Sequence, residues 1–79
     1  MKKYVSVTVS ITDFGPECHK WCRVYEKFPG EQMTERTISY DKARRMMWEL
    51  KLAGAYKTTA VNPYDPHINT TDVRLHLPV

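Results

Sequence analysis

The feature that most constrains this chain is a strict alternation of side-chain types over residues 3–11. Its apolar positions are Val5, Val7, Val9 and Ile11. The positions between them carry hydroxyl or phenol groups. Because successive side chains of a strand point to opposite faces, the alternation predicts a strand with one buried face. It leaves no continuous apolar run for a signal peptide, and no other stretch is long enough to cross a bilayer, so we expect a cytoplasmic protein.

Four further segments favour strands. Residues 19–28 have an apolar side with Cys22 and Val24, and a second side on which rings and cationic stems can cover one another. That second side holds Trp21, Arg23, Tyr25 and Lys27. Residues 71–77 alternate again, with one face of Val73, Leu75 and Leu77 and another of Asp72, Arg74 and His76. Residues 55–61 are rich in Thr, Tyr and Val, and residues 32–38 carry a weaker strand signal.

One amphipathic helix is predicted over residues 40–53. Ser39 is a good N-cap, Asp41 suits the positive end of the helix dipole, and Gly54 is a natural stop. The apolar side chains that recur at helical spacing are Tyr40, Ala43, Met46, Met47, Leu50 and Ala53.

The length of 79 residues allows one domain with a small core, which we assign to residues 1–79. The element order β-β-(β)-α-β-β predicts an α+β fold, in which an antiparallel sheet of four to five strands carries one amphipathic helix on one face. The opposite face of the sheet is expected to be solvated or functional. The net charge of +3 is mildly basic, which excludes an acidic mimic of DNA.

The densest group of metal-ligand side chains is the run Cys18-His19-Lys20-Trp21-Cys22. Thiolate and imidazole are the ligands that zinc prefers, and a structural site takes four of them. The up-and-down order of the strands brings the loops at 12–18 and 62–70 to one end of the sheet, which makes His67 the expected partner. The sequence therefore predicts a structural Zn(II) site formed by Cys18, His19, Cys22 and His67.

The geometry of a straight strand opposes that site. Residues 18 and 22 would lie about 13 Å apart, because each residue of a strand rises roughly 3.3 Å. Zinc bound to both cysteines requires a turn or bulge at 18–22; otherwise one cysteine is used, and Asp13 or Asp65 fills the vacancy. The alternative is two buried structural thiols and a surface histidine.

Basic side chains gather on the helix and on the strand at residues 19–28. They are Lys42, Arg44, Arg45 and Lys51, together with Lys20, Arg23 and Lys27. With Trp21 and Tyr25 as a stacking platform, this set fits a nucleic-acid-binding surface. Asp41 and Glu49 interrupt the positive field, so a solvated helix face is the alternative.

Aromatic and arginine side chains are also frequent anchors of protein interfaces. The expected partner-binding residues are Trp21, Arg23, Tyr25, Arg44, Arg45 and Trp48. The chain has only three glycines, with no glycine-rich phosphate or oxyanion loop. No nucleophile, base and orienting group stand in a recognisable set either, so we expect a protein that is not an enzyme.

The run Cys18-His19-x-x-Cys22, the helix from Ser39 to Gly54 and the proline-rich loop at 62–66 give the whole chain a resemblance to small phage-encoded inhibitors. In profile it resembles the anti-CRISPR proteins, a group without a common fold or motif. The resemblance implies a non-enzymatic protein that acts in the host bacterial cytoplasm. It would bind a defence protein such as a CRISPR effector nuclease and block its action on DNA.

Many such inhibitors are acidic DNA mimics, whereas this chain is +3, which implies a protein surface as its target. The main alternative is a small zinc-stabilised nucleic-acid-binding module. A structural or accessory phage protein is a third interpretation.

Overall fold

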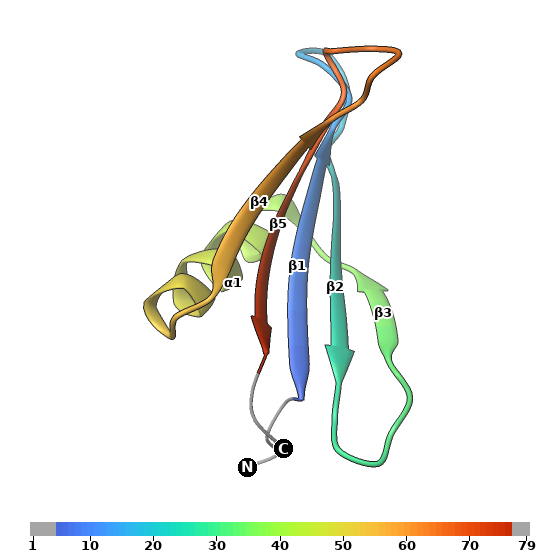
Figure 1. Ribbon diagram of the computed structural model, residues 1–79. Coiled ribbons are helices and arrows are strands. Elements are labelled where there is room, and N and C mark those ends of the chain that lie inside the picture. Colours follow the sequence, from blue (N-terminus) through green and yellow to red (C-terminus); the bar gives the residue numbers. More distant parts are fainter. Residues whose placement is uncertain (1–4, 77–79) are drawn as a thin grey trace.

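The computed structural model describes residues 5–76, which form a five-stranded antiparallel sheet and a helix (Figure 1). The strands are β1 (Ser6–Asp13), β2 (Trp21–Lys27), β3 (Thr34–Thr37), β4 (Tyr56–Val61) and β5 (Asn69–His76). Helix α1 (Tyr40–Leu52) follows β3 in the chain. The order in the sheet is β3-β2-β1-β5-β4, so β1 is the central strand and β3 and β4 are the edges.

The register of the strands assigns each side chain to one face of the sheet. Val9 of β1 lies opposite Val24 of β2 and Val73 of β5, so these three valines form one row. At most 1 % of the surface of each valine is exposed. Ala43 of α1 packs into the same cluster, which places the core between the helix and the central strands.

Helix α1 begins and ends where the capping residues predict. The Ser39 hydroxyl accepts a hydrogen bond from the N–H of Lys42 at 3.2 Å, which satisfies a backbone donor of the first turn. Gly54 has φ of +101°, a conformation that side chains with a Cβ rarely adopt. The chain can therefore leave the helix at Gly54 and enter β4.

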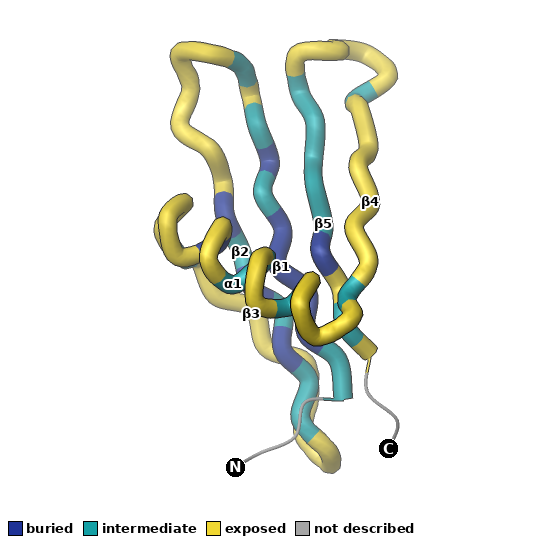
Figure 2. The backbone as a smooth tube through the Cα atoms, turned by 90° about the vertical axis from the view of Figure 1, so that its left-hand side faces the viewer, coloured by how far each residue is buried: buried dark blue, intermediate teal, exposed yellow. Residues whose placement is uncertain are grey.

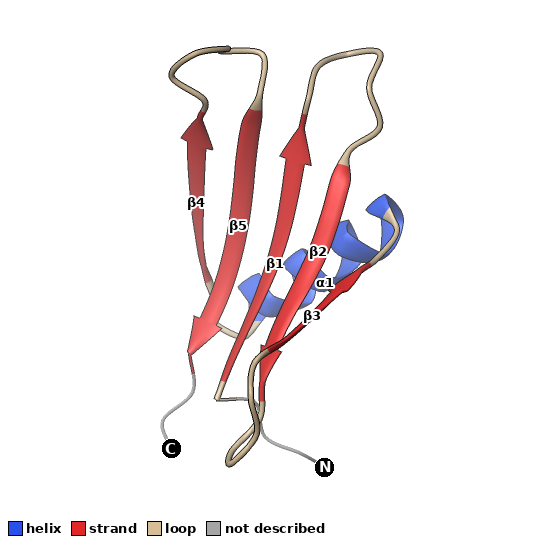
Figure 3. Cartoon of the chain, turned by 90° about the vertical axis from the view of Figure 1, so that its right-hand side faces the viewer, coloured by secondary structure: helices blue, strands red, loops and turns tan. Residues whose placement is uncertain are grey.

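The opposite face of the sheet is covered by no other element of residues 5–76 (Figure 3). The β1–β2 loop and the β4–β5 loop lie at one end of the sheet, as predicted from the strand order (Figure 1). Within the same residues, no helix combines the length and the apolar character required to cross a bilayer.

The predicted α+β fold is confirmed, and the differences concern the ends of the strands. β3 has four residues rather than the seven of 32–38: Thr34–Thr37 pair with β2, and Ile38 adds one backbone hydrogen bond to Cys22. β1 and β5 run further than expected, since Asp13 pairs with Asn69. Residues 3 and 4 of the predicted strand at 3–11, and Leu77 of the predicted strand at 71–77, lie outside the described residues.

Candidate functional site

The side chains predicted to bind a partner lie on two opposite sides of the sheet. Three of them come from β2, where they alternate with buried core residues and therefore lie on the open face: Trp21, Arg23 and Tyr25. The other three belong to α1, which packs on the covered face: Arg44, Arg45 and Trp48. The six residues therefore contribute to two separate surfaces.

The open face rests on a row of hydroxyl groups along β1. Thr8, Ser10 and Thr12 are only 8 %, 3 % and 7 % exposed, although no helix or second sheet of residues 5–76 lies above them. Long side chains from the neighbouring strands must therefore cover these three residues. The pairing of the strands places two such side chains there: Arg23 of β2 lies opposite Ser10, and Arg74 of β5 lies opposite Thr8.

Arg23 is the centre of a hydrogen-bonded network on this face. Its Nη2 donates to the hydroxyls of Ser10 at 3.1 Å and Thr12 at 3.0 Å. Its Nη1 donates to the Tyr25 hydroxyl at 3.0 Å, and its guanidinium stacks 3.7 Å from the centre of the Trp21 ring. The expected covering of rings by cationic stems is confirmed, and the two aromatic side chains are tied to one arginine.

A groove of 490 Å³ runs across the open face beside this network. Its lining includes Arg23, Tyr25, Asp72, Arg74 and His76. The Nε of Arg74 donates to the Thr8 hydroxyl at 3.1 Å, so the second arginine is also hydrogen-bonded to the hydroxyl row of β1. Charges of both signs line this open-face groove.

A smaller groove of 230 Å³ lies on the covered face, between α1 and the strands β4 and β5. It is lined by Arg44, Trp48, Lys51 and Lys57 among others, and its lining contains no acidic residue. Trp48 is 64 % exposed, so its ring is accessible on α1. Arg45 is also exposed on α1 but does not line this helix-side groove.

The predicted zinc ligands occupy two different environments. Cys22 is a buried strand residue opposite Ile11, within the core under α1, whereas Cys18 is exposed in the β1–β2 loop. Cys18 shares a pocket of 420 Å³ with Asp65 and His67, in the two loops that meet at one end of the sheet. His19 is exposed and does not line that pocket.

Among residues 5–76, no three His, Cys, Asp or Glu side chains are grouped so that they could hold a metal ion. The zinc site formed by Cys18, His19, Cys22 and His67 therefore stays a prediction. Elemental analysis of the chain purified without a histidine tag tests it. A single zinc per chain supports the site, and protein that contains no zinc after expression in zinc-supplemented medium contradicts it.

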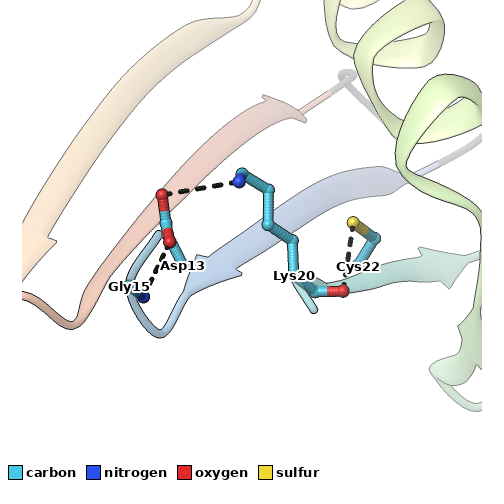
Figure 4. A network of polar contacts seen from close by, with 4 residues as sticks. All are labelled: Asp13, Gly15, Lys20 and Cys22. Carbon is cyan, nitrogen blue, oxygen red and sulfur yellow. Dashed lines mark hydrogen bonds and ion pairs between the residues drawn. The ribbon is translucent and has the colours of Figure 1, made fainter. Parts of the chain in front are cut away.

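The segment between β1 and β2 is held by local polar contacts (Figure 4). The Asp13 carboxylate accepts the N–H of Gly15 at 2.9 Å and lies 3.7 Å from the Lys20 ammonium. Burial raises the pKa of the Cys22 thiol, and the positive charges of Lys20 and Arg23 offset part of that rise. Cys22 is therefore a neutral core residue at ordinary pH rather than a poised thiolate.

Sequence reasoning missed Arg74, the hydroxyl row of β1 and Lys57 as components of surfaces. Arg74 and Thr8 are each part of an alternating strand, so their place on the open face followed from the pattern. Their contact did not, because it depends on which strands are neighbours. The arrangement β1-β5-β4 is also what brings Lys57 of β4 beside α1.

Comparisons of this chain with protein-family models, with curated proteins and with solved structures found no match.

Proposed function

We propose that the protein is a non-enzymatic inhibitor that binds a bacterial defence protein through the open face of its sheet. The target class is the CRISPR effector nuclease, whose action on DNA the bound inhibitor would block in the bacterial cytoplasm. The observation that carries the choice of surface is the Arg23 network. One guanidinium fixes Trp21 and Tyr25 beside an open groove of 490 Å³.

Side-chain order on the open face supports this choice. Association costs free energy for every flexible side chain that becomes fixed, so an interface that is ordered beforehand binds more tightly. Arg23 is already held by a stack on Trp21 and by hydrogen bonds to Tyr25 and Ser10. Trp, Tyr and Arg are also the residue types that most often dominate binding energy, so the network presents suitable anchors.

The charge pattern of the open face favours a protein over a nucleic acid. Asp72 lines the groove with Arg74, and Glu35 lies on the same face because it pairs with Tyr25. Phosphate binding requires several cations that act together, and these carboxylates would oppose it. The Nη1 and Nη2 donors of Arg23 are also directed at Tyr25 and at hydroxyls of β1, while its buried Nε has no hydrogen-bond partner among the described residues.

The second candidate function is binding of nucleic acid in the helix-side groove. Arg44, Lys51 and Lys57 line that groove, its lining among the described residues includes no acidic side chain, and Trp48 beside them is exposed enough to stack on a base. This candidate predicts affinity that falls steeply with salt, because bound phosphates release counterions.

Two tryptophans on opposite sides of the sheet provide a matched test. The assay measures DNA cleavage by purified CRISPR effector nucleases in the presence of increasing concentrations of the wild-type chain, of Trp21→Ala or of Trp48→Ala. We expect Trp21→Ala to raise the inhibitory concentration about 30-fold, as truncation of an interface anchor costs about 2 kcal/mol. Trp48→Ala, an equally large truncation, should change it less than about threefold. Circular dichroism confirms that both variants are folded.

Other results would reject parts of the proposal. If the chain inhibits no effector nuclease, the proposed target class is wrong. If Trp48→Ala abolishes inhibition and Trp21→Ala does not, the binding surface is the helix side. Tight binding to DNA or RNA in a mobility-shift titration, lost at higher salt and in Lys51→Ala, supports the second candidate instead.

A further inference from the structure

The two edge strands of the sheet differ in how they are protected against pairing with another chain. β3 is four residues long and carries the adjacent charges Glu35 and Arg36. β4 is six residues long, every one of them is exposed, and Lys57 is its only charge (Figure 2). Short edges with several charges resist strand addition, whereas a longer edge with one charge and β-forming residues is less protected against it.

The direction of the backbone groups of β4 follows from its pairing with β5. The N–H of Asn62 donates to the carbonyl of Ile68 at 2.8 Å, so residue 62 faces β5. Backbone groups of an antiparallel strand point alternately to one neighbour and to the other. Lys57, Thr59 and Val61 therefore direct their N–H and C=O groups away from the sheet, towards the free edge.

We propose that this edge is an interface for a second copy of the chain, in which the two β4 strands pair antiparallel about Thr59. In this register Thr59 lies opposite Thr59 of the second copy, and Lys57 lies opposite Val61. Each of these pairs joins outward-facing backbone groups, so each can exchange two hydrogen bonds.

The side chains of β4 are compatible with pairing to themselves in this register. The two lysines are separated from one another, so no like charges stand directly opposite. Threonine opposite threonine is a favourable cross-strand pair. Because strands related by a two-fold axis perpendicular to the sheet keep their faces, the open faces of the two copies would form one continuous surface.

Exposed apolar side chains lie at both ends of the same edge. Leu52, at the end of α1 just before β4, is 73 % exposed, and Tyr64, in the loop after β4, is 95 % exposed. Antiparallel pairing brings the end of β4 in one copy to the start of β4 in the other. The Leu52 region of each chain would then meet the Tyr64 region of its partner, and both would lose apolar surface to water.

Proline at the outward-facing position 59 tests the interface with little damage to the sheet. Thr59→Pro removes an N–H that points away from β5, which an edge strand tolerates. Thr37→Pro is the matched control on β3: Ile38 donates to Cys22 at 3.0 Å, so Thr37 also faces outward. Thr59→Lys is a second variant, because it would place two lysines opposite one another in the pair.

Sedimentation equilibrium of the full chain measures the outcome. We expect the wild type and Thr37→Pro to be dimers, and Thr59→Pro and Thr59→Lys to raise the dissociation constant at least about tenfold. Unchanged circular dichroism of Thr59→Lys shows that the sheet is intact. A wild type that stays monomeric up to about 1 mM overturns the proposal. Dimers that persist in Thr59→Lys overturn it as well, since they would use another surface.

Discussion

The two faces of the sheet bury their residues by different means. On the covered face, Val9, Val24 and Val73 lose contact with water because α1 and one another exclude it. On the open face, Thr8 and Ser10 are also buried, but the cover consists of arginine and tyrosine side chains from the adjacent strands.

This difference separates residues that hold the fold from residues that shape a surface. Burial of apolar groups beneath α1 is non-directional and stabilises the fold in proportion to the area removed from water. The cover of the open face depends on specific hydrogen bonds, each of which contributes little net stability. It does, however, hold Trp21 and Tyr25 in a defined arrangement.

The largest effect is expected from truncation on the covered face. Val9→Ala removes two methyl groups from a fully buried position between Val24 and Val73, and should lower the free energy of unfolding by about 2 kcal/mol. In a domain of this size that change lowers the melting temperature by roughly 10 °C. The adjacent Thr8→Ala, on the open face, should cost about 1 kcal/mol through the lost bond to Arg74.

Thermal and urea denaturation of the two variants measure this difference. Equal losses would contradict the comparison, because they would mean that the open face carries as much of the stability as the core.

A smaller effect is expected from removal of the cover itself. Arg23→Ala exposes the hydroxyls of Ser10 and Thr12 to water rather than leaving them unsatisfied, because no helix or strand in the described part of the chain lies above them. We therefore expect a loss of about 1 kcal/mol, from weaker hydrogen bonding and from the lost stack on Trp21. Arg45→Ala, an exposed arginine on α1, should change stability by less than about 0.5 kcal/mol.

Tryptophan fluorescence gives a second measure of the same variant. Release of Trp21 from the guanidinium should alter its emission in Arg23→Ala and leave it unchanged in Arg45→Ala. If the emission of Arg23→Ala is the same as that of the wild type, the Arg23 network does not order the Trp21 ring.

The sequence predicts the architecture because the determinants of the architecture are local. Alternation around Val9 specifies a strand and its buried side, and Ser39 and Gly54 specify the two ends of the helix. The end of β3 could not be located in this way. Thr34–Thr37 form a strand because they pair with β2. The segment itself has little apolar character that would mark its ends.

The candidate sites were less accessible to sequence reasoning. The stack of Arg23 on Trp21 was predictable, because the two residues are separated by one position on the same strand. The bond from Arg74 to Thr8 was not, because it requires β5 to lie beside β1. The positions of Cys18 and Cys22 depend on where β2 begins, and its start at Trp21 leaves the first cysteine in the loop.

The smallest effect on stability is expected from the cysteines, one of which is buried under α1 while the other is exposed in a loop. Burial raises the pKa of Cys22 above its ordinary value of 9.0, so the folded chain keeps that proton to higher pH than the unfolded chain does. The thiol therefore contributes its full stabilisation below about pH 9 and loses it as the pH rises through the raised value. Cys18, by contrast, is exposed in the loop before β2.

The Cys22→Ala variant isolates this contribution from other groups that titrate at high pH. The stability difference between the wild type and Cys22→Ala should narrow as the pH rises above about 9, because only the wild type carries this thiol. Under native conditions a thiol reagent should label Cys18 rapidly and Cys22 only as fast as the core opens. Equal labelling rates, or a stability difference for Cys22→Ala that does not change with pH, would mean that the face covered by α1 admits water. The contrast between the faces would then be smaller than the burial of Cys22 implies.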